Sequence, residues 1–173
     1  MSGFYNVENP GNFNTNNPTI LLQRNLRFIK KGFNQKDEIE NLATGDTTIL
    51  AKEMLAGWII RTPLGVDQIT DTSDTAVNIY NEIVRVLKGQ CSDSFGILPG
   101  FNFDFGIYNE GEDAEIVFQP GDGVVFGLDN QFLIPTGKSV WFRLTVTRIP
   151  NKTVTPNITP EIYITQLSSP ALP

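Results

Sequence analysis

The stretch FLIPTGKSVWFRLTVTRI, residues 132–149, contains the clearest alternation of apolar and polar residues in the chain. One side carries four apolar residues, Val140, Phe142, Leu144 and Val146, and the other side carries Trp141, Arg143, Thr145 and Thr147. Successive side chains of a strand point to opposite faces, so this pattern predicts a long β-strand with one buried face. Pro135, Thr136 and Gly137 predict a turn that separates it from a short apolar strand.

Similar patterns extend outward from this stretch in both directions. FNFDFGIYN, residues 101–109, places Phe101, Phe103, Phe105 and Ile107 on one face, and EIVFQ, VVFGL and EIYITQL predict further strands. Upstream, TTILAKEMLAG predicts a strand and a helical turn that ends at Gly57, followed by the short buried strand GWIIRT. Short strands separated by Gly/Pro-rich turns are typical of a β-sandwich or barrel, and we predict an all-β fold, a jelly-roll-like β-sandwich.

One helix interrupts the strands, in TDTSDTAVNIYNEIVRVLKG, residues 70–89. Its apolar stripe consists of Ala76, Ile79, Tyr80, Ile83 and Leu87. Thr72, Ser73 and Asp74 can each cap the first turn, and Gly89 is a natural terminator. We predict an amphipathic helix over about residues 72–88 that covers an edge or open end of a sheet.

The first 46 residues differ from the remainder in composition and charge. Residues 1–36 contain five basic residues and one acidic residue, a net charge of +4, whereas the remainder carries −10 of the total of −6. We predict an extended N-terminal arm over residues 1–46, a β-sandwich domain over residues 47–168 and a short tail over residues 169–173. The arm can lie on its own domain or on a neighbour.

The composition excludes several classes of chemistry. The sequence has no histidine, which removes Ser–His–Asp and Cys–His catalysis and Cys/His zinc sites. Cys91 is the only cysteine, so no internal disulfide can form. We expect no enzymatic activity and no cofactor. No apolar run approaches the ~20 residues that span a bilayer, and MSGFYNVENPGNFN lacks the pattern of a secretory signal.

The order of motifs along the chain resembles a domain of structural proteins from large DNA viruses and tailed phages. The matching segments are LAKEMLAGWIIRTP, TDTSDTAVNIYNEI, FDFGIYNEGEDAEIVFQPGDGVVF, IPTGKSVWFRLTVTRI and IYITQL, over roughly Leu50–Leu167 and without the arm. These motifs concern the fold and not catalysis. The resemblance implies a capsid-associated or decoration role, often in oligomers.

We therefore expect a non-enzymatic virion structural protein, a minor capsid, cement or decoration protein that binds neighbouring capsid subunits through its arm and β domain. The expected partners are other capsid proteins and further copies of the chain, a trimer among the options. Location in the virion after synthesis in the host cytoplasm follows from the same resemblance, and we expect no nucleic acid and no membrane span. The alternative is a carbohydrate-binding or receptor-recognition module.

Acidic residues supply the remaining chemical candidates. The loop with Glu110, Glu112, Asp113 and Glu115 could gather oxygen ligands for Ca²⁺, although a solvated turn explains it better. Asp122 fits a hairpin turn, and Asp71 and Asp74 fit the start of the helix. Asp104 and Glu110 could form a carboxylate pair for glycoside hydrolysis, but no cleft motif accompanies them. We therefore predict no catalytic and no metal site.

Aromatic and basic residues supply the interface candidates. Trp58, Trp141, Tyr80, Tyr108 and Tyr163 could line a sugar-binding face or a subunit interface, and Trp141 lies opposite the apolar face of its strand. In the arm, apolar residues interleave the basic ones, which favours a protein groove over a polyanion. Our interface candidates are Arg24, Leu26, Arg27, Phe28, Lys30, Lys31 and Trp141.

Overall fold

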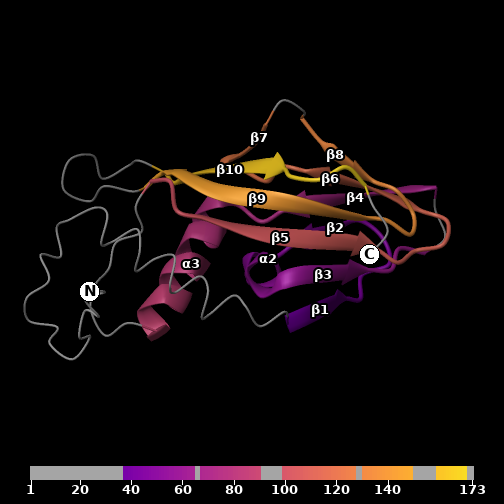
Figure 1. Cartoon of the computed structure of the whole chain (residues 1–173), viewed down its shortest axis with the longest axis horizontal. Helices are drawn as coiled ribbons and strands as arrows, with labels where there is room; N and C mark the ends of the chain where they lie inside the picture. The colour runs from indigo at the N-terminus through magenta and orange to yellow at the C-terminus, as the bar shows by residue number, and fades with distance from the viewer. Residues whose placement is uncertain (1–36, 65–66, 91–98, 128–129, 150–158, 171–173) are drawn as a thin grey trace, which may run out of the picture.

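Ten strands form two sheets in the computed structural model, which describes residues 37–64, 67–90, 99–127, 130–149 and 159–170 (Figure 1). The six-stranded sheet has the order β1 (Asp37–Asn41), β3 (Gly57–Arg61), β5 (Asn102–Asn109), β9 (Ser139–Arg148), β10 (Glu161–Gln166) and β7 (Val124–Phe126). The four-stranded sheet has the order β2 (Thr47–Ile49), β4 (Gln68–Ser73), β6 (Glu115–Gln119) and β8 (Phe132–Ile134). Two helices, α2 (Ala51–Ala56) and α3 (Ala76–Gln90), complete the described elements. The prediction of a mainly β, sandwich-like fold is confirmed.

The alternation in the sequence sets which face of each strand is buried. The predicted inner residues of β9 are all buried, and β5 buries Phe103, Phe105 and Ile107 in the same way. The two strands pair antiparallel, with Phe105 opposite Phe142. The inner face of the six-stranded sheet is therefore continuous and apolar across its centre.

Phenylalanine rings join the two sheets. Phe118 of β6 lies with its ring centroid 6.4 Å from that of Phe105 and 5.3 Å from that of Phe142. Phe132 of β8 lies 5.3 Å from Phe142, and Phe126 of β7 lies 4.8 Å from Phe132. Aromatic pairs at these distances contribute about 0.5–1.5 kcal/mol beyond the area that they bury, so this cluster ties the sheets together.

Helix α3 buries the predicted apolar stripe. Ala76, Ile79, Ile83 and Leu87 are buried in the shared core, and Tyr80 packs against it. The start of the helix was predicted wrongly, because residues 70–73 belong to strand β4 and the helix begins at Ala76. The threonines of this stretch suit a strand, and the alternation continues from Ile69.

The first turn of α3 is held by Asp74, one of the three predicted caps, and by Thr75, the residue after it. The Thr75 hydroxyl accepts a hydrogen bond from the backbone N–H of Asn78 at 3.2 Å, and Asp74 accepts one from the Asn78 side chain at 2.7 Å. Asp74 also accepts from the backbone N–H of Ala51 in α2 at 3.1 Å. The start of α3 is thereby fixed to α2, and Figure 1 shows both helices towards one end of the sandwich.

Gly57 ends α2 and begins β3, as the sequence predicts. Its φ of 96° lies in the left-handed region, and its N–H donates to the Met54 carbonyl. An L residue with a side chain would be strained at this backbone angle.

The chain alternates between the two sheets from β1 to β8. Five of the eight pairings between described strands are parallel, including β1 with β3, β3 with β5, β2 with β4 and β4 with β6. A jelly roll is built from antiparallel Greek keys. The predicted jelly-roll-like order is therefore not confirmed by these pairings.

Strand β1 is the edge of the six-stranded sheet, and it lies inside the range 1–46 that we assigned to the arm. Its parallel register with β3 places Ile39 beside Ile59 and Asn41 beside Arg61. Residues 37–41 are thus part of the sheet, and the arm residues 1–36 lie outside the described part of the chain.

Candidate interaction surface

Three aromatic side chains meet on the outer face of the six-stranded sheet. Trp58 of β3, Tyr108 of β5 and Trp141 of β9 occupy outward positions, opposite the buried residues of their strands. The ring centroids of Trp58 and Trp141 lie 5.2 Å apart, and the Trp58 and Tyr108 rings stack at 6.5 Å with 17° between their planes. We call these three side chains, with Gly106 beneath them, the aromatic surface.

Gly106 makes this arrangement possible. A Cβ at this position would lie 2.5 Å from the six-membered ring of Trp58 and 3.3 Å from Trp141. Gly106 is paired with both strands, opposite Trp58 in the parallel register and opposite Trp141 in the antiparallel one. The missing side chain lets the two indole rings close over the strand between them. All three aromatic residues stay half-buried, so part of each remains accessible.

An exposed ion pair borders the aromatic surface. The Arg143 guanidinium donates to both carboxylate oxygens of Asp104, with N–O distances of 2.7 and 2.8 Å. The two side chains are 45% and 40% exposed, and the hydrogen bond to Asp104 raises the pKa of Arg143. Exposed pairs of this kind contribute about 0–1 kcal/mol to stability, so this pair matters more as a polar border to the aromatic surface.

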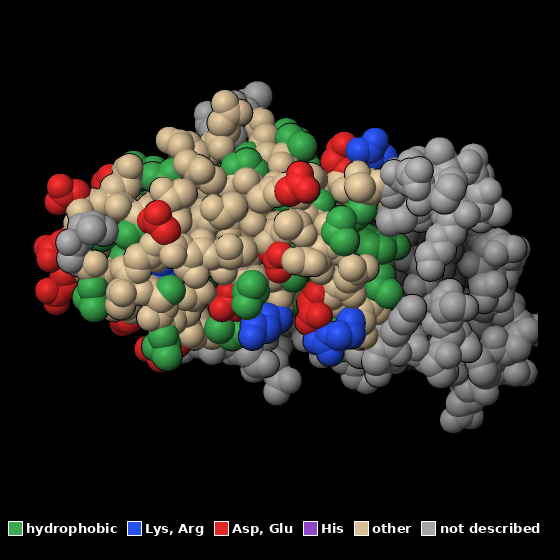
Figure 2. Space-filling view, turned by 180° about the vertical axis from the view of Figure 1, so that it is seen from behind, with side chains coloured by type: hydrophobic (Ala, Val, Ile, Leu, Met, Phe, Trp, Pro, Cys, Tyr) green, Lys and Arg blue, Asp and Glu red, His purple; other side chains and the backbone are tan. Residues whose placement is uncertain are grey.

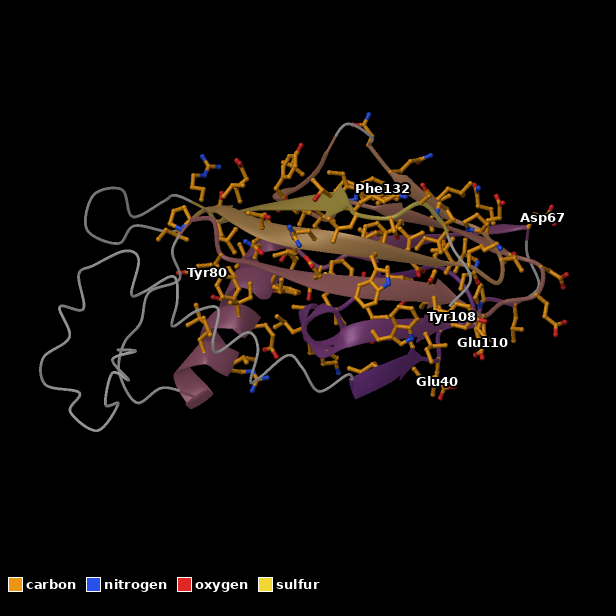
Figure 3. All side chains as sticks on the ribbon, in the orientation of Figure 1. Glu40, Asp67, Tyr80, Tyr108, Glu110 and Phe132 are labelled. Carbon is orange, nitrogen blue, oxygen red and sulfur yellow. The ribbon has the colours of Figure 1, made fainter. Side chains whose placement is uncertain are left out.

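Of the five aromatic candidates, the structure brings together Trp58, Tyr108 and Trp141. Tyr80 packs instead against the core from α3, and Tyr163 lies on β10, beside Thr145. Figure 3 labels Tyr108 and Tyr80 at separate places on the sandwich. The three residues occupy outward positions on their strands, and Gly106 lies between Trp58 and Trp141. This signal could have grouped them only once the pairing of the strands was known.

The other interface candidates, Arg24, Leu26, Arg27, Phe28, Lys30 and Lys31, lie outside the described residues, as does Cys91.

Glu110 lies at the same end of the sandwich as Asp67 in Figure 3, and Figure 2 shows acidic side chains gathered at that end. Asp74 and Asp122 lie instead at the start of α3, where the Asp122 carbonyl accepts a hydrogen bond from the Ala76 N–H. Within the described ranges, no group of three or more acidic side chains is arranged to hold a metal ion. Asp104 and Glu110 are six residues apart along β5 and its end, which corresponds to about 20 Å. A glycosidase pair requires roughly 5–9.5 Å, so these two carboxylates are not brought together.

Asp71 has a different role from the one that we predicted. It lies in β4, not at the start of the helix, and forms a fully buried ion pair with Arg61 of β3. The Arg61 guanidinium donates to both Asp71 oxygens at 2.7 and 2.9 Å. Burial raises the pKa of the Asp71 carboxyl, while the hydrogen bond and the charge of Arg61 oppose that shift. This pair connects the two sheets through the core.

Arg61 also holds the link between β1 and β2. Its remaining N–H groups donate to the carbonyls of Asn41, Ala43 and Gly45. This role of Arg61 was not predicted from the sequence, although Arg61 lies on the same face of β3 as buried Ile59. Its position two residues after Ile59, on the same face of the strand, was the available signal that the Arg61 side chain points into the core.

Comparison with models of known protein families, with characterised proteins and with solved structures gives no match. Among the described residues, no helix is both long and apolar enough to cross a membrane.

Proposed function

We propose that this chain is a virion structural protein without enzymatic activity, a minor capsid, cement or decoration protein that binds neighbouring capsid subunits. The observation that carries the proposal is the aromatic surface on the outer face of the six-stranded sheet. Tryptophan and tyrosine are enriched at protein interfaces, where they provide large contact areas at low cost in side-chain entropy. Partner binding would cover the rings of Trp58 and Trp141 that the fold leaves partly accessible.

The resemblance to virion proteins adds support from the sequence. Its motifs fall on elements that build the framework, including α2 with β3, the end of β4 with the start of α3, and strands β5, β9 and β10. The jelly-roll-like strand order that we predicted from the strand pattern is not confirmed.

The proposal is tested by the solution mass of the full chain, measured by sedimentation over a range of concentrations. We expect the mass to rise with concentration, and Trp141→Ser to weaken that association. Tyr163→Ser is the matched control, because Tyr163 is also half-buried on the outer face but makes no ring contact with Trp58 in the described structure. Equal effects of the two substitutions would argue against the aromatic surface as the interface.

A second candidate function is carbohydrate or receptor recognition. The observation that favours it is the close placement of Trp58 and Trp141 beside the exposed Asp104–Arg143 pair. Aromatic rings can pack against the C–H faces of sugars while a few placed polar groups fix their orientation. A glycan array and a sugar-dependent shift in melting temperature separate the two candidates. Binding of a defined glycan by a monomer, lost in Trp141→Ser, would favour this second function.

A further inference from the structure

We propose that the arm segment Arg24–Phe33 of one copy binds the aromatic surface of a second copy. This inference rests on the proposed function, because it names the partner of the surface that we assign to assembly. The occupant is a segment of this chain that lies outside the described residues, so the argument uses its sequence, its length and its point of attachment.

The arm is attached close to the aromatic surface. Residue 36 is followed directly by β1, the edge strand, and the order β1, β3, β5, β9 places Trp58 one strand and Trp141 three strands from that edge. Neighbouring strands lie about 4.8 Å apart, so the aromatic surface extends to about 14 Å from β1. Ten extended residues span roughly 33 Å, which is enough to cross it. The segment is therefore long enough to cover the aromatic surface of either copy.

The chemistry of the segment RNLRFIKKGF fits that of the surface. It interleaves four cations with Leu26, Phe28, Ile29 and Phe33. Cations are attracted to the faces of tryptophan and tyrosine rings, and apolar side chains can pack between them. Glu40 on β1 occupies an exposed outward position and adds negative charge beside the aromatic surface, whereas the charge of Asp104 is balanced by its ion pair with Arg143.

Charge complementarity favours a contact between the arm and an acidic body, and the proposed assembly role places that body in a second copy. Residues 37–173 carry a net charge of −10 and residues 1–36 carry +4. Two acidic bodies repel each other, and a basic segment placed between them offsets that repulsion at the contact.

Intrinsic fluorescence of the full chain reports on this contact directly. Trp58 and Trp141 are the only tryptophans in the sequence, and both belong to the aromatic surface. We would measure the emission maximum and the sedimentation mass of the same samples over a concentration series. The arm variant is Phe28→Asp, and the matched control is Phe13→Asp, which makes the same change outside the basic segment.

We expect the emission to shift to the blue as the mass rises, and Phe28→Asp to lower the association constant about tenfold or more while Phe13→Asp does not. An emission that changes with Phe28→Asp but not with concentration would mean that the arm covers its own body, and would overturn the inference. If Phe28→Asp assembles like the wild type and has the same emission, the arm does not bind the aromatic surface. That result would overturn the inference, while the proposed assembly role would stand. A monomer at every concentration, with no effect of Phe28→Asp, would overturn both.

Discussion

Breaking the buried ion pair between Arg61 and Asp71 is expected to destabilise the chain more than any exposed substitution. Both side chains are fully buried, and Arg61→Met would leave the Asp71 carboxylate without its bidentate partner. Removal of one partner from a buried pair costs about 3–5 kcal/mol, against a total free energy of unfolding of about 5–15 kcal/mol. Urea unfolding followed by far-ultraviolet circular dichroism measures the loss.

The double variant Arg61→Met/Asp71→Leu separates the pair from its surroundings. Once one charge is removed, removing the other takes away a buried group that has no partner, so the double variant should lose less than the sum of the single variants. We expect a coupling energy of about 2–3 kcal/mol. The double variant should still be less stable than the wild type, because the carbonyls of Asn41, Ala43 and Gly45 lose the Arg61 donor. Additive losses would refute the assignment of the pair as a coupled unit.

The same pair has a pH signature. Burial raises the pKa of Asp71, so the folded chain holds this proton more tightly than the unfolded chain. The free energy of unfolding should therefore fall as the pH rises from the ordinary aspartate pKa to the raised one. This part of the pH dependence should be missing in the double variant, and an unchanged profile would contradict it.

Three further predictions concern the helix and the aromatic surface. Ile83→Asp buries an unpaired charge and should cost about 4 kcal/mol or more, and a melting curve like that of the wild type would reject the assigned buried face. Gly106→Ala places a methyl group against the Trp58 ring and should cost about 1–3 kcal/mol, with a changed tryptophan emission as the readout. The hydrogen bond from Arg85 lowers the pKa of Glu82 in the folded chain. Ionised Glu82 therefore stabilises the fold above the ordinary glutamate pKa, and this stabilisation is lost as the pH falls through the lowered pKa. Glu82→Gln should flatten the pH dependence of unfolding below the ordinary glutamate pKa, and an unchanged slope would exclude this contribution.

The sequence was most informative where the spacing of apolar residues repeats over a long, unbroken segment. The inner residues of β9 and the apolar stripe of α3 could be predicted because ten-residue and fifteen-residue elements repeat their period several times. The start of α3 could not, since Thr72 and Ser73 serve equally well as helix caps and as strand residues. The pairing of β4 with β2 and β6 decides between the two.

The aromatic surface depends on information that one sequence does not contain. The parity of Trp141 predicted that it faces outward, but its neighbour Trp58 lies more than 80 residues earlier in the chain. Their contact follows from the order β3–β5–β9, which combines one parallel and one antiparallel pairing. The same limit applies to Arg61 and Asp71, because they come from strands of different sheets.

The alternation of the chain between the sheets has a consequence for folding kinetics. Among the described strands, β9 and β10 are the only consecutive pair that are also hydrogen-bonded neighbours. Every other pairing joins segments separated by at least one strand of the opposite sheet, so loop-closure entropy must be overcome before those contacts form. Chains dominated by such non-local pairings fold slowly, over milliseconds to seconds. Since neither sheet can be completed before the other has begun, we expect both to form and melt in one cooperative step, without a stable half-folded body.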